Sequence, residues 1–193
     1  MGKPTFDQLG EFHDLADAGR VTSQNFQAYL RRPDRYLEDI TEIVNPQFRI
    51  LTVTIDRARR YKKARDAGEY NHVNANINPE NFPMNRGRGV VKMRVGVFTL
   101  GRGATDDEVV ARRNELGLLP IGMEHEFAVG EQFKDLQCEL GWIANRDVVW
   151  TDAGGRRRFS FLCSCGNDDG RHMDVFEFDG GWDGHWWFFG LCK

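Results

Sequence analysis

Two histidines and an aspartate near the C-terminus have the types and spacing that most resemble a reaction centre. His172 and Asp174 are two residues apart, so on a strand both side chains share one face, and His185 follows on the next expected strand. A histidine oriented by a carboxylate can act as a general base or as a metal ligand. One hypothesis is therefore a hydrolase or metal enzyme at His172, Asp174 and His185. The alternative is that they belong to a solvated sheet face.

The thiols of Cys163 and Cys165 are the weak candidates for a metal site. They also share a strand face, with His172 across the following turn. Structural zinc sites usually place two cysteines about two to four residues apart at a turn, which a Cys-x-Cys strand does not provide. We therefore expect buried, inert thiols, no bound metal and no cofactor.

A run of positive charge at residues 57–65 is the clearest candidate for binding an anion. It holds six basic residues in nine, and the cations we single out are Arg59, Arg60, Lys62 and Lys63. Such a cluster on one helix face can hold a phosphate backbone, with Tyr61 available for stacking. The segment predicts, as one alternative, an RNA-binding protein. A solvated helix face is the other interpretation.

Aromatic residues concentrate at the end of the chain. His185, Trp187 and Phe189 would point to one side of a strand, and Trp186 and Phe188 to the other. Buried aromatic anchors often dominate the energetics of protein interfaces. With no assembled reaction centre evident, our leading hypothesis is a non-enzymatic binding or interaction module for a protein partner. It would use Trp182, Trp187, Phe189 and the asparagine-rich stretch 71–81.

His125-Glu126 resembles the start of a zinc protease helix, but Val129 stands where that motif needs a second histidine. We therefore interpret residues 123–126 as the exposed start of a helix. Carboxylates there would complement the helix dipole.

Composition limits the class of protein. The chain has 193 residues, 40% of them hydrophobic, four cysteines and a net charge of -3. These values exclude a disordered chain and a disulfide scaffold, and the charge predicts no general attraction to nucleic acid. No segment approaches the roughly 18 apolar residues of a membrane span or resembles a secretory signal. We expect a cytoplasmic protein with no membrane contact.

The elements that must position these residues predict an α+β fold. Residues 1–46 are expected to form a helical N-terminal region, and residues 47–193 an α+β domain with a mixed middle and an irregular connection at 69–89. Thr105 and Glu108 form a capping box at the start of one helix. Strands are expected at 48–55 and 90–100, helices at 56–67, 105–116 and 124–136, and a C-terminal antiparallel β-meander at 146–151, 156–163, 172–178 and 185–192.

Several segments together resemble a group of small uncharacterised bacterial proteins known from candidate-phylum genomes. The matching segments are 17–30, 70–83, Gly117-Leu118-Leu119-Pro120 and Gly181-Trp182-Asp183-Gly184, with an echo at 130–137. They are turn and cap signatures. The group has no established activity, so the resemblance implies no functional residue here.

Overall fold

The computed structural model describes residues 47–165, 170–178 and 180–193. The chain divides into two compact units, Met1–Ile50 and Leu51–Lys193. The expected helices of residues 1–46 lie outside the described residues. All described residues from Leu51 onward belong to the second unit.

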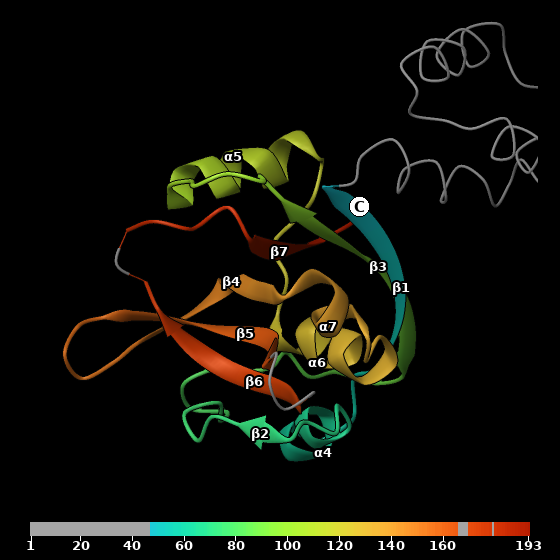
Figure 1. The fold of residues 1–193 in the computed structure, drawn as a ribbon. Coiled ribbons are helices and arrows are strands. Elements are labelled where there is room, and N and C mark those ends of the chain that lie inside the picture. The colour runs from blue at the N-terminus through green and yellow to red at the C-terminus, as the bar shows by residue number, and fades with distance from the viewer. Residues whose placement is uncertain (1–46, 166–169, 179) are drawn as a thin grey trace, which may run out of the picture. The chain divides into compact units, whose positions relative to one another are not determined.

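A seven-stranded mixed sheet forms the framework (Figure 1). The strands lie in the order β1-β3-β7-β4-β5-β6-β2. β7 runs antiparallel to β3 and parallel to β4, and β2 runs parallel to β6. The strands are β1 (Phe48–Asp56), β2 (His72–Val73), β3 (Val90–Thr99), β4 (Trp142–Thr151), β5 (Arg157–Cys165), β6 (Gly170–Glu177) and β7 (Trp186–Leu191).

Four short helices accompany the sheet in the described part of the chain. They are α4 (Tyr61–Asp66), α5 (Asp106–Glu115), α6 (Met123–Gln132) and α7 (Leu136–Leu140). In this part of the chain, no helix has the length and apolar character needed to cross a membrane.

The predicted fold class is wrong. The described residues form one mixed sheet with few and short helices, and the last four strands are not a meander. β7 leaves β6 and inserts between β3 and β4, so β4, β5 and β6 alone are joined by consecutive antiparallel pairing. The reason is long-range pairing: Val95 to Thr99 of β3 pair with Trp187 to Leu191 of β7.

Local signals explain the individual elements. β3 lies where alternation predicted a strand, and the capping box of α5 is present, with the Thr105 hydroxyl accepting from the Glu108 amide. The expected helix at 56–67 is shortened to α4, because Arg57 exchanges backbone hydrogen bonds with Gly87 and Gly89 and so continues the extended chain. The expected helix at 124–136 is divided at Phe133, whose backbone leaves the helical region.

The two faces of the sheet carry different cores. On one face, α6 packs through Phe127 and Val129 against Ile143, Leu162 and other alternating strand residues. On the other face, aromatic rings bury one another: Phe159, Trp186 and Phe188 are each at most 2% exposed, and Trp182 from the loop before β7 packs against all three. Mutual packing of large rings thus replaces a helical cover there.

Candidate functional site

A basic groove lies between α4 and the segment that ends the asparagine-rich connection. Its volume is about 710 Å³. Four of its lining residues are cations and none is acidic, although the chain as a whole has a net charge of -3. We call it the basic groove, and its lining residues are Arg60, Tyr61, Lys62, Arg65, Asn78, Pro79, Pro83, Met84 and Arg86.

The helix wall of the basic groove is held by the core. α4 has only six residues, too few to be stable alone. Ala64 is buried, and the Tyr61 ring meets Phe127 of α6 edge-on with centroids 5.1 Å apart. Arg59, just before the helix, forms an ion pair with Glu131 of α6 at 2.6 Å. Packing on α6 therefore fixes the direction in which the basic side chains point.

The opposite wall is ordered by buried anchors and by asparagine side chains. Ile77 and Phe82 are fully buried. Between them the Asn78 carbonyl oxygen accepts from the backbone amides of Glu80 and Asn81, each at 3.0 Å. Such local bonds replace those of a strand or helix. They explain how a stretch without periodicity, lying beside α4 and β2 (Figure 1), holds a defined shape.

The cations of the basic groove differ in how far they are already neutralised. Asp66 forms ion pairs with Lys62 and Arg65, and the hydrogen bond from Lys62, followed by that from Arg65, holds the pKa of Asp66 below its usual value. Arg65 also donates to the Ile77 carbonyl at 3.1 Å, joining the two walls. Within the described ranges, no ion pair is found for Arg60 or Arg86, and both are exposed. These two guanidinium groups are available to an anion.

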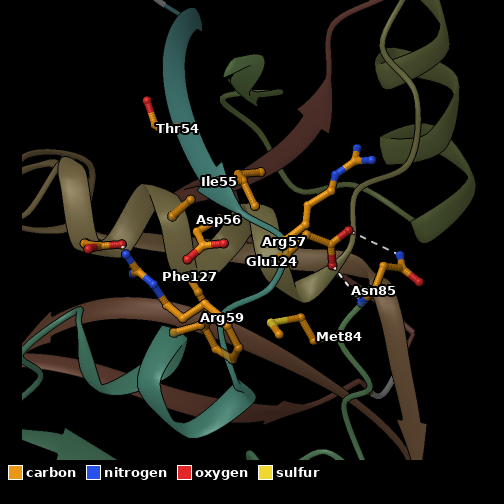
Figure 2. A pocket seen from close by; sticks show the side chains of 12 residues that line it. Thr54, Ile55, Asp56, Arg57, Arg59, Met84, Asn85, Glu124 and Phe127 are labelled. Atoms are coloured by element: carbon orange, nitrogen blue, oxygen red, sulfur yellow. Dashed lines mark hydrogen bonds and ion pairs between the residues drawn. The ribbon is translucent and has the colours of Figure 1, made fainter. Parts of the chain in front are cut away.

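Of the four basic residues singled out from the sequence, the structure places Arg60 and Lys62 in the lining of the basic groove. Lys63 is exposed on α4 outside that lining. Arg59 turns to Glu131, where it lines a separate pocket of about 20 Å³. In that pocket Glu124 of α6 accepts from the backbone and side-chain nitrogens of Asn85, at 3.1 and 3.2 Å (Figure 2). Its volume suits a single water rather than a ligand.

The expected exposed helix start at residues 123–126 is wrong. Glu126 has no solvent exposure, and His125 is 6% exposed. Burial raises the pKa of Glu126 to about 7, against the opposing hydrogen bonds from Ser160 and Asn145, and burial lowers the pKa of His125. The sequence contained a signal for this: Met123, Glu126, Phe127 and Gly130 share one face at helical spacing.

The histidine and aspartate candidates are not gathered into one centre. β6, which holds His172 and Asp174, is separated by β5 and β4 from β7, and His185 directly precedes β7. Asp174 accepts from Asn74 at 2.6 Å, and the His172 ring lies 5.7 Å from that of His72. His185 instead packs edge-on against Trp142, 4.9 Å between centroids.

The thiol candidates have a comparable outcome. Cys163 is buried opposite His172 in the β5–β6 register. The side chain of Cys165 is not among the described ones. The described residues contain no group of three or more histidine, cysteine, aspartate or glutamate side chains arranged to hold a metal ion.

The aromatic candidates lie mainly inside the molecule. Trp182 is 3% exposed and Phe189 2%, while Trp187 is partly buried against the core below α6. The exposed aromatic of this region is Trp142, which sequence reasoning did not select and which is 38% exposed.

In comparisons with known proteins, no family model, no curated protein sequence and no solved structure matches this chain.

Proposed function

We propose that this protein is a binding protein for single-stranded nucleic acid, with RNA as its expected ligand, and that the basic groove holds the phosphate backbone. The observation that carries the proposal is the lining of four cations without a carboxylate, in a chain of net negative charge. Phosphates are the ligand for which such a groove gains most, because each contact releases condensed counterions.

The other lining groups fit a nucleic acid strand. Pro79, Pro83 and Met84 give the basic groove apolar walls against which sugars and bases can pack. The Tyr61 ring is already engaged with Phe127, so it offers one edge rather than a free stacking platform. We therefore expect binding dominated by phosphate contacts, with weak sequence preference and a strong dependence on salt.

The test is fluorescence anisotropy of a labelled twelve-nucleotide oligouridylate, titrated with the protein at several salt concentrations. The variant Arg60→Gln/Arg86→Gln removes the two cations without an ion pair in the described ranges. We expect it to weaken binding about tenfold at low salt and to flatten the logarithmic salt slope by roughly two, one for each lost phosphate contact.

The matched control is Lys92→Gln/Arg94→Gln, which removes the same charge from exposed positions on β3, outside the basic groove. It should bind almost as the wild type does. Equal loss in both variants would mean a diffuse charge effect and would overturn the site. Absence of binding, or equal competition by polyglutamate, would overturn the nucleic acid proposal, the latter in favour of an acidic protein partner.

A further inference from the structure

A buried carboxylate lies directly behind the helix wall of the basic groove. Glu126 is fully buried on α6, and its Oε2 accepts from the Ser160 hydroxyl at 2.7 Å and from Asn145 Nδ2 at 3.0 Å. Its other oxygen, Oε1, is buried and has no hydrogen-bond partner. An acceptor left open in this way is costly when charged, and a proton on the carboxyl relieves the cost.

Tyr61 connects Glu126 with the basic groove. Its ring lines the groove from α4, yet its hydroxyl is buried and has no hydrogen-bond partner. The pKa of Tyr61 is raised first by burial and next by the charge of Glu126, so the two groups are within electrostatic reach. The hydroxyl of Tyr70, from the segment after α4, has the same status and is affected by Glu126 in the same order.

The other charged groups here do not neutralise Glu126. Arg65 lowers the pKa of Tyr61, while Arg171 lowers and Glu131 raises that of Tyr70, each less strongly than burial does. The Arg171 guanidinium is committed to the carbonyl oxygens of Gly68 and Gly130. Among the described residues no cation forms an ion pair with Glu126, so a proton is its available counter-charge.

We propose that protonation of Glu126 and anion binding in the basic groove are coupled, so that the groove holds nucleic acid more tightly when Glu126 is neutral. A negative charge behind α4 repels phosphates in front of it through a medium of low dielectric constant. Linkage is reciprocal, so the bound anion must draw a proton onto Glu126. This inference rests on the proposed function and adds its regulation by pH.

The experiment measures oligouridylate affinity between pH 5.5 and 8, a range in which the phosphodiester does not titrate. We expect wild-type affinity to fall about fivefold across the range beyond any change in Glu126→Gln, in which the group is permanently neutral. Glu115→Gln, which removes an exposed carboxylate on α5, should retain the wild-type pH dependence. Changes from histidine titration are common to all three proteins and cancel in the comparison.

A second measurement needs no variant. Calorimetric titration at pH 7 in two buffers of different ionisation enthalpy should report net proton uptake by the wild type on binding. Binding that is equally pH-dependent in wild type and Glu126→Gln, or that takes up no proton, overturns the coupling and leaves the proposed function standing. If oligouridylate fails to bind at any pH, the proposed function is refuted, and this coupling with it.

Discussion

Replacing Glu126 by glutamine should remove a specific pH dependence from the stability of the protein. Its folded pKa of about 7 lies above the ordinary value of 4.5, so the folded chain keeps a proton that the unfolded chain releases between these pH values. The stabilising contribution is therefore complete below pH 4.5 and is lost as the pH rises through 7. At about 1.4 kcal/mol per pKa unit, the total is about 3 kcal/mol.

The assay is urea unfolding of wild type and Glu126→Gln at several values between pH 5 and pH 8. The difference in unfolding free energy between the two proteins should change by about 3 kcal/mol over this range, in favour of the glutamine variant at high pH. Glutamine keeps an oxygen that can accept from Ser160 and Asn145, so packing is disturbed little.

Other titrating groups do not imitate this result. Burial lowers the pKa of His125, and that gives a stability which rises with pH, opposite in sign to the Glu126 contribution. Because His125 is present in both proteins, its contribution cancels in the difference. Glu108 and Asp152, with pKa values of about 2, act at lower pH. A difference that stays constant within about 0.5 kcal/mol from pH 5 to pH 8 would refute the assigned ionisation.

Three further substitutions test the packing around the site, each by urea unfolding. Gly130→Ala would place a methyl group 1.8 Å from the Tyr70 hydroxyl oxygen and should cost more than about 2 kcal/mol, part of which Tyr70→Phe in the same chain should restore; an unaffected Gly130→Ala protein would contradict this packing. Arg113→Met leaves the buried carboxylate of Asp147 without its main partner and should cost about 3 kcal/mol, whereas a loss below about 1 kcal/mol would show that water reaches the pair. Thr105→Ala removes the hydroxyl of the capping box and should cost about 1 kcal/mol, with Thr105→Ser as the near-neutral control.

The elements that the sequence predicted are those set by neighbours along the chain. The alternation in β3 and the Thr105 capping box need only a few adjacent residues to be recognised. The position of β7 is different, because its pairing with β3 joins residues about ninety positions apart, and turn signals before Trp186 fit a hairpin with β6 equally well. Only the complementary surfaces of β3 and β4 exclude that hairpin.

The candidate site was predicted in part for the same reason. The charge run at 57–65 marked one wall of the basic groove, but the sequence did not indicate that residues 78–86 form the other. That wall depends on the burial of Ile77 and Phe82, twelve or more positions beyond Arg65. The buried state of Glu126 was missed because its acidic neighbours suggested a solvated helix start, although the apolar face to which it belongs was visible in the spacing.

The shortness of α4 makes the basic groove dependent on the core. A six-residue helix persists only while Tyr61 and Ala64 remain packed on α6, so the direction of Arg60 and Lys62 is a property of the core rather than of the basic segment. The same Tyr61 that anchors α4 reaches the region around Glu126. A change of charge at Glu126 therefore acts on the basic groove in two ways: through the field on bound phosphates, and through the packing that presents the cations. A neutral substitution at Glu126 removes the first and largely preserves the second, which is why the pH dependence, more than the affinity itself, reports the coupling.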